Sequence, residues 1–164
     1  MSNVQTASID DTSSDSLIGY LAQGGTVAKA NNISSNALEV TYATAHNQYK
    51  NGQYEDAARI FQYLCVYDQW SSRYFLGLGS CQKMLRLYGQ AIDTFSFAYQ
   101  LDEDNPLPLI YMADCHRILN ESDVAIAMYN SALQLARQEK INHKEVSRAE
   151  SILSTIEMPS REKH

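Results

Sequence analysis

The side chains that could support catalysis or bind a metal are present in this chain, but their spacing fits neither role. Asp114 and His116 stand two positions apart on an expected helix, so they point to different sides and form no catalytic pair. The histidines also lack the spacing of metal ligands; they are His46, His116, His143 and His164. The sequence therefore predicts no enzyme, no metal site and no cofactor.

The cysteines and one glycine motif have simpler explanations than chemistry. Cys65, Cys81 and Cys115 include no Cys-x-x-Cys pair, and each stands among apolar residues at helical spacing. This pattern predicts small core side chains in a reducing compartment. The run Gly77-Leu78-Gly79 resembles part of a phosphate-binding loop, but no strand precedes it and no third glycine follows. We therefore predict that these glycines serve close packing inside a helix.

Charge and hydropathy argue against two further classes of function. The 164 residues carry a formal net charge of −6, whereas a nucleic-acid-binding protein needs a basic surface. No apolar run approaches the ~18 residues that a membrane span requires. Residues 1–16 lack the basic and apolar regions of a signal peptide. The sequence therefore predicts a cytoplasmic protein that neither binds nucleic acid nor inserts into a membrane.

A repeat of 34 residues organises the middle of the chain. Its clearest column holds three alanines, Ala57, Ala91 and Ala125. Three more columns keep this spacing: a small residue twelve positions earlier, an aromatic residue four positions later and a mostly small residue seven positions later. In that order they are Ala45, Gly79 and Ala113, then Phe61, Phe95 and Tyr129, then Leu64, Ala98 and Ala132. Four columns in one register over three periods indicate tetratricopeptide-type repeats.

These columns predict an all-α fold of three tandem helical hairpins stacked into a right-handed solenoid. Small residues let the two helices of a hairpin cross closely, and the aromatic residue fills the space to the next hairpin. The repeats are expected near 38–71, 72–105 and 106–139. Turn signals stand at the middle of each repeat, at Asn51-Gly52, at Arg86 to Gly89 and at Asn120 to Ser122.

Shorter segments flank the repeat domain, which is expected to span residues 35–158. Residues 1–16 and 159–164 are predicted to be disordered tails. Residues 17–34 are predicted to form a short N-terminal helical segment that turns at Gly24-Gly25, and Asn36 is the expected cap of the first repeat helix. An apolar stripe after Ala136 predicts a C-terminal helix that covers the end of the array. Its charged residues are expected to face solvent; they are Arg137, Glu139, Lys140, Lys144, Glu145 and Arg148.

The first helix of each hairpin should line the concave face of the solenoid. The expected groove residues are Tyr42, His46, Tyr49, Lys50, Arg73, Leu76, Ser80, Lys83, Ile110, Asp114 and Arg117. Tyrosine rings offer a large contact area at low entropic cost, and their hydroxyls can bond to a peptide backbone. This face therefore suits an extended peptide with a few apolar anchors, unless Tyr42 and Tyr49 are buried beneath the N-terminal segment.

Two other functions are known for helical repeat proteins of this kind. A co-chaperone that grips an acidic C-terminal tail needs Lys, Asn and Arg at fixed groove positions. Here those positions hold Tyr42, His46, Gly77, Leu107 and Tyr111. The alternative that stays open is a generic protein–protein interaction scaffold or an assembly subunit, although a subunit of an envelope complex would usually carry an export signal.

Several stretches resemble the class II chaperones of bacterial type III secretion, small repeat proteins that serve translocator subunits. The most specific stretch is the run Ser72-Arg73-Tyr74-Phe75-Leu76-Gly77-Leu78-Gly79. The others are Gly24-Gly25-Thr26, Ile33-Ser34-Ser35, Leu38-Glu39, Asn47-Gln48-Tyr49, Gly52 to Ala57, Phe61-Gln62, and Leu64-Cys65-Val66 with Asp68. The similarity covers roughly residues 17–135 and weakens in the third repeat.

The resemblance implies a cytoplasmic protein of a Gram-negative bacterium that binds hydrophobic, pore-forming translocators and keeps them soluble before export. It implies that a short extended segment near the translocator N-terminus, with apolar and proline anchors, lies in the concave groove. The anchor pockets would be lined by Tyr42, His46, Tyr49 and Leu76. The resemblance further implies a homodimer, whose contact would be made by Leu17, Ile18, Tyr20 and Leu21.

Overall fold

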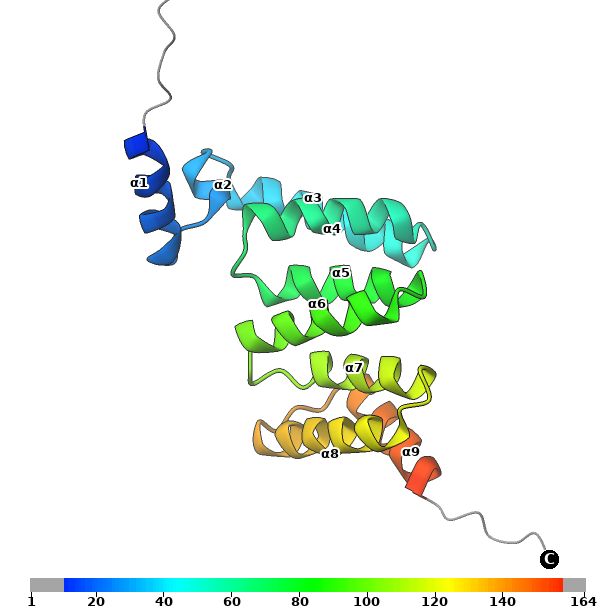
Figure 1. Ribbon diagram of the computed structural model, residues 1–164. Coiled ribbons are helices and arrows are strands. Elements are labelled where there is room, and N and C mark those ends of the chain that lie inside the picture. Colours follow the sequence, from blue (N-terminus) through cyan, green and yellow to red (C-terminus); the bar gives the residue numbers. More distant parts are fainter. Residues whose placement is uncertain (1–10, 158–164) are drawn as a thin grey trace, which may run out of the picture.

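Helices α3 to α8 pair into three antiparallel hairpins that stack one upon the next (Figure 1). The computed structural model describes residues 11–157, with side chains from Ser16 onward, and this range is helical with short connections. The helices are α1 (Asp11–Ala22), α2 (Val27–Ala30), α3 (Ser35–Lys50), α4 (Tyr54–Tyr67), α5 (Ser72–Met84), α6 (Tyr88–Leu101), α7 (Leu107–Ile118), α8 (Ser122–Gln138) and α9 (Lys144–Glu157). The predicted all-α repeat fold is confirmed.

The turn inside each hairpin uses one backbone conformation at one repeat position. Gly52, Arg86 and Asn120 follow the first helix of their hairpins with positive φ angles of 78°, 62° and 63°. The next amide closes each turn by donating 2.9 Å to a carbonyl five residues earlier, in the pairs Gln53–Gln48, Leu87–Gln82 and Glu121–His116. Glycine adopts this conformation without strain, yet two of the three repeats form it with other residues. The turns therefore lie where the sequence predicts them.

Close packing explains the glycines of α5. A Cβ atom added at Gly77 would lie 2.3 Å from the Phe61 ring, and one added at Gly79 would lie 2.6 Å from the Phe95 ring. Both rings are buried, and each belongs to the aromatic column of the repeat. Van der Waals contact needs more than 3 Å, so only glycine lets these rings approach the helix. The packing interpretation of Gly77-Leu78-Gly79 is therefore confirmed.

The three cysteines are buried and free of disulfides. Burial raises the pKa of Cys65 and of Cys81 to about 12, and that of Cys115 to about 11. A thiol with so high a pKa stays protonated near neutral pH and is a poor nucleophile. The structure therefore agrees with the prediction that these residues are small core side chains.

Helix α9 covers the end of the array by packing on both α7 and α8. Its buried residues Val146, Ala149 and Leu153 join Ile110 of α7 in one hydrophobic cluster. The expectation that all charged residues of this segment face solvent is wrong for two of them. Arg148 donates hydrogen bonds to Asp114 and to Glu145, which draws both charged α9 side chains inward.

The N-terminal segment differs from expectation at its boundaries. Helix α1 begins at Asp11, so part of the segment expected to be a tail is helical; residues 1–10 and the expected tail 159–164 lie outside the described residues. Ser34, rather than Asn36, caps α3, because its hydroxyl accepts a hydrogen bond from the Ala37 amide at 3.1 Å. No helix in the described part of the chain is long and apolar enough to cross a membrane.

Candidate peptide-binding groove

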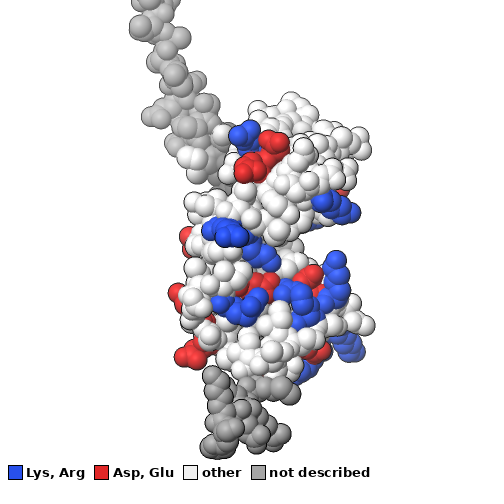
Figure 2. All heavy atoms as spheres, turned by 90° about the vertical axis from the view of Figure 1, so that its right-hand side faces the viewer, with Lys and Arg blue, Asp and Glu red and all other residues white. Residues whose placement is uncertain are grey.

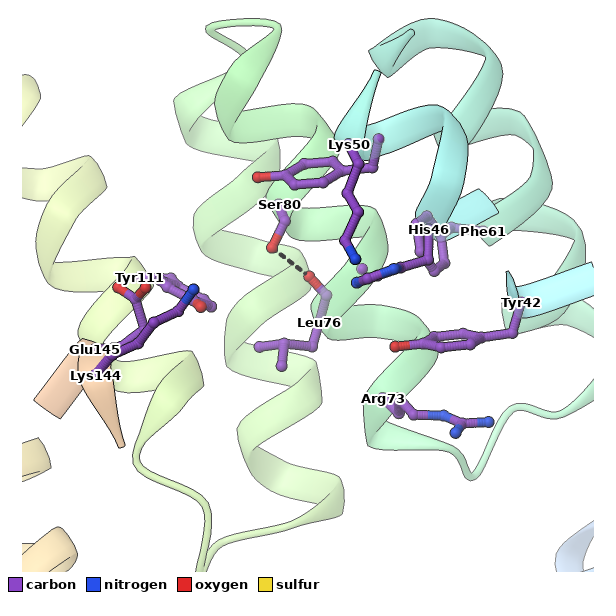
Figure 3. A pocket seen from close by; sticks show the side chains of 12 residues that line it. Tyr42, His46, Lys50, Phe61, Arg73, Leu76, Ser80, Tyr111, Lys144 and Glu145 are labelled. Atoms are coloured by element: carbon purple, nitrogen blue, oxygen red, sulfur yellow. Dashed lines mark hydrogen bonds between the residues drawn. The ribbon is translucent and has the colours of Figure 1, made fainter. Parts of the chain in front are cut away.

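A groove of about 410 Å³ opens on the concave face between α3, α5, α7 and the start of α9 (Figure 3). Seven of the predicted groove residues line it: Tyr42, His46, Tyr49, Lys50, Arg73, Leu76 and Ser80. Tyr42 and Tyr49 therefore face this groove rather than lying beneath the N-terminal segment. The 34-residue register thus leads to seven of the twelve residues that line this groove.

The α3 wall is a stack of flat side chains. The Tyr42 and His46 rings lie 6.0 Å apart with an interplanar angle of 20°, and the Arg73 guanidinium lies 4.1 Å from the centre of the Tyr42 ring. Arg73 also forms an ion pair with Glu39, which fixes its plane against the ring. The stack offers a pre-ordered surface for an apolar side chain or a proline ring.

The floor of the groove is mainly apolar. Leu76 projects into its centre in Figure 3, and Ser80 donates its hydroxyl proton to the Leu76 carbonyl at 2.8 Å. That internal bond satisfies the Ser80 hydroxyl donor, so this side chain leaves no unsatisfied donor in the floor of the groove. Burial, reinforced by nearby acidic groups, raises the pKa of Tyr49 above its ordinary value, so this phenol stays neutral and keeps its proton for donation.

The prediction missed five residues that line the groove. Tyr111, Lys144 and Glu145 form the wall opposite α3, whereas Phe61 lies beside Tyr42 and His46, and Gly77 belongs to α5 (Figure 3). Burial raises the pKa of Tyr111 to about 12, and Lys83 lies 4.6 Å from the centre of its ring. Lys144 and Glu145 come from the start of α9, which stands one repeat period after Ile110 and Tyr111. Extending the 34-residue register by one more unit would have found them.

Ile110 was expected to line the groove, and this placement is wrong. Its side chain is 0% exposed and packs with Val146, Ala149 and Leu153 of α9. The equivalent positions of the first two repeats, Tyr42 and Leu76, stay open because no capping helix packs over them. The C-terminal helix therefore removes the third repeat's apolar position from the concave surface.

Lys83, Asp114 and Arg117 line a second, neighbouring pocket of about 370 Å³ instead of the groove itself. Asp114 is only 4% exposed, and it accepts hydrogen bonds from three other helices. Arg148 reaches it at 3.0 and 2.8 Å, the Tyr129 hydroxyl at 2.5 Å and Lys83 at 3.2 Å. This buried network joins α5, α7, α8 and α9.

The pKa of Asp114 follows from these partners. Burial alone would raise it, but the hydrogen bonds from Arg148 and Tyr129 and the charges of Lys83 and Arg148 outweigh burial and lower the pKa below its ordinary value. Asp114 is therefore ionised at neutral pH. It holds the α7–α9 contact together by charge-assisted hydrogen bonds.

The residues predicted to form a dimer contact lie on α1, at the far end of the molecule from α9 (Figure 1). Ile18 is 65% exposed and Leu17 44% exposed, with Tyr20 also exposed and Leu21 partly so. The Tyr20 ring lies over Gly25, whose carbonyl accepts hydrogen bonds from Gln69 at 2.9 Å and from the Trp70 indole at 3.0 Å. These bonds anchor the turn after α1 and leave the apolar face of α1 without a partner inside the described part of the chain.

The arrangement supports binding better than chemistry. Between residues 16 and 157 no group of three or more His, Cys, Asp or Glu side chains could hold a metal ion. The positions that a clamp for an acidic tail would need hold Tyr42, His46, Gly77, Leu107 and Tyr111 instead of lysine, asparagine and arginine. The fold and the groove define a helical repeat protein with an open groove lined by aromatic side chains.

Comparison with known proteins places the chain in a family, although no family model matches it. Low calcium response locus protein H of Yersinia pestis is 40% identical over 149 residues, which cover 88% of this chain and 86% of that protein. PcrH of Pseudomonas aeruginosa, solved with the chaperone binding region of PopD, matches with a TM-score of 0.71 at 37% identity, covering 75% of this chain and 92% of that one.

The type III secretion translocator chaperone SycD of Yersinia enterocolitica, solved in an alternative dimer, matches with a TM-score of 0.70 at 36% identity. The match covers 76% of this chain and 94% of that one. The chain therefore belongs to the translocator chaperones of type III secretion systems, the class II chaperones. The resemblance drawn from the sequence is confirmed.

Proposed function

We propose that this protein is a cytoplasmic chaperone that binds hydrophobic translocators through an extended segment in the concave groove. The observation that carries the proposal is the open groove of α3 and α5, with its stacked Tyr42, His46 and Arg73 and its apolar floor at Leu76. PcrH, which is 37% identical to this chain over the matched region, is known in complex with the chaperone binding region of PopD.

The mechanism requires only binding. A translocator exposes long apolar segments that would associate or enter the wrong membrane, and a chaperone that occupies part of this surface lowers the concentration of the associating form. The groove supplies aromatic side chains whose rings are already ordered by stacking, so these side chains lose little entropy when the cargo binds. Neither catalysis nor a cofactor is needed for this role.

The exposed face of α1 supports a homodimer as part of the same proposal. Leu17, Ile18 and Tyr20 present apolar surface, and the hydrogen bonds from Gln69 and Trp70 to Gly25 anchor the turn that follows α1. Two copies that pair these faces would remove the apolar side chains from water. SycD, which matches this chain at 36% identity, is known as a dimer.

Co-expression tests the function directly. The protein is expressed with each translocator gene of its secretion locus, and the soluble translocator that co-purifies is quantified. We expect one or more translocators to become soluble with the wild type and to be lost with Tyr49→Ala, while Tyr63→Ala, an exposed tyrosine of α4 outside the groove, behaves as the wild type. Insoluble translocators in the presence of the folded wild type would contradict the proposal.

A further inference from the structure

A basic pocket beside the groove has no role in apolar anchoring. It lies at the C-terminal ends of α5 and α7, next to the turns of the second and third hairpins, and its volume is about 370 Å³. Its lining consists of Lys83, Met84, Arg86, Tyr88, Asp114, Arg117, Ile118 and Arg148. Seen from the side of the hairpin turns, Lys and Arg gather at this level of the molecule, around a few carboxylates (Figure 2).

The pocket carries more positive charge than its own carboxylates neutralise. Four cationic side chains converge on it, against Asp114 and against Glu145, which accepts a 2.6 Å hydrogen bond from Arg148. Two formal positive charges are left over, in a protein whose net charge is −6. Arg86 and Arg117 form no ion pair with any residue between 16 and 157.

Fold stability explains only part of this excess. Lys83 and Arg117 stand in the last turns of α5 and α7, where cations interact favourably with the helix dipole, and Lys83 also pairs with Asp114. Arg86 has no ion-pair partner among the described residues, and it occupies the positive-φ turn position that glycine fills in the first repeat and asparagine in the third. Either of those residues would serve the turn with less strain.

The basic pocket adjoins the groove. Tyr111 lines the groove and lies beneath Lys83, whereas Glu145 lines the groove and bonds to Arg148. Ser80 of the groove floor and Lys83 of the pocket stand three positions apart on α5, about 4.5 Å along the helix axis. One or two residues of an extended peptide span this distance.

We propose that the basic pocket receives an Asp or Glu side chain of the same translocator segment whose apolar anchors enter the groove. This inference rests on the proposed function and adds a charged position to the recognised segment. The carboxylate would lie between Arg86 and Arg117, the two cations without an ion-pair partner among the described residues, in a partly enclosed site where charge-assisted bonds are stronger than on open surface. It would also set the register of the segment, since an apolar stripe alone permits sliding.

The test compares two double variants with a synthetic peptide of the protected segment, obtained by limited proteolysis of the purified chaperone–translocator complex. In R86Q/R117Q the two cations without an ion-pair partner among the described residues are neutralised, whereas R59Q/R137Q neutralises two exposed arginines outside the pocket. We expect R86Q/R117Q to bind the peptide about 5- to 20-fold more weakly, the effect of one or two partly exposed charge pairs. R59Q/R137Q should bind as the wild type, and the salt dependence of affinity should be weaker only in R86Q/R117Q.

A double-mutant cycle locates the carboxylate. Each Asp and Glu of the peptide is replaced in turn by Asn or Gln, and one replacement should weaken binding to the wild type while leaving R86Q/R117Q unaffected. Equal affinity and equal salt dependence of R86Q/R117Q and the wild type would overturn the inference, and so would a cycle without coupling at any position. A wild type that binds no translocator would instead contradict the proposed function, so the two failures are distinguishable.

Discussion

The concave face has an open end formed by α3 and α5 and a closed end where α9 packs on α7. One repeat column runs through both ends, because His46, Ser80, Asp114 and Arg148 follow each other at 34-residue intervals. At the open end, His46 stacks on Tyr42 and Ser80 bonds to its own helix, so both border free space. At the closed end, Asp114 and Arg148 bond to each other.

This difference teaches that repeat register alone does not assign a role. A position in the concave column binds a ligand only where no later helix packs over it. In the third repeat, α9 continues the first-helix register, and its residues take the space that stays open in the first two repeats. The packing of α9 on α7 therefore serves the shape of the solenoid, whereas the side chains of α3 and α5 stay accessible to apolar anchors.

The largest effect is expected from a charge at the centre of the open end. Leu76→Asp places a carboxylate where an apolar anchor of the cargo must lie, and the unpaired charge loses its water when cargo binds. We expect affinity for the cargo peptide to fall about 1,000-fold, or roughly 4 kcal/mol. Isothermal titration calorimetry measures the loss.

Val66→Asp is the matched control for Leu76→Asp, because Val66 is 60% exposed on α4 and lines none of the pockets described above. It should bind cargo as the wild type does, and both variants should keep their helical circular dichroism signal. Undiminished binding by Leu76→Asp would place the anchors elsewhere on the molecule.

The next largest effect is expected at the closed end, where a substitution of Asp114 should lower the stability of the fold. Asp114→Asn removes the charge that Arg148 and Lys83 face, and leaves these cations with a weaker partner at a buried site. We expect the free energy of unfolding to fall by about 3 kcal/mol, measured by urea denaturation. Asp93→Asn on the exposed side of α6 should change stability by less than about 0.5 kcal/mol.

The two ends should respond separately to these changes. If the comparison holds, Leu76→Asp lowers affinity without lowering stability, whereas Asp114→Asn lowers stability with only a small change in affinity under conditions where it is folded. An Asp114→Asn protein as stable as the wild type would mean that the apolar contacts of α9 alone hold the closed end.

Acid should act on the closed end through Asp114. Folding lowers the pKa of this carboxyl, so the folded state binds its proton less tightly than the unfolded chain. The resulting stabilisation is complete above the unfolded pKa near 4, and it is lost as the pH falls through the lower pKa of the folded state. Below pH 4 the stability of the wild type should therefore fall faster than that of Asp114→Asn, with a difference in slope of at most about 1.4 kcal/mol per pH unit. Parallel pH profiles of unfolding would argue against this role of Asp114.

The sequence could predict the open end because its determinants are local and periodic. Ala45, Gly79 and Phe61 fix the hairpin register, and the register determines which side chains of α3 and α5 face inward. The sequence predicted a helix that covers the end of the array but not which side chains that helix buries. The burial of Ile110 depends on how α9 packs, and no second helix follows α9 in the described residues to complete a repeat. The pairing of Asp114 with Arg148 is visible as a 34-residue spacing only once α9 is seen to continue the register.

The smallest effect is expected from Arg73, which orders the Tyr42 ring of the open end before cargo binds. Arg73 lies over the Tyr42 ring and pairs with Glu39, but both charged side chains are about half exposed, so the pair contributes little to stability. Arg73→Gln should lower the free energy of unfolding by less than about 0.5 kcal/mol, yet weaken cargo binding by roughly 3- to 5-fold, because Tyr42 loses the cation that holds its ring in place. Arg73→Lys keeps the charge but not the flat guanidinium, and should recover only part of the affinity. Full recovery by Arg73→Lys would show that charge, rather than stacking, prepares the open end for its ligand.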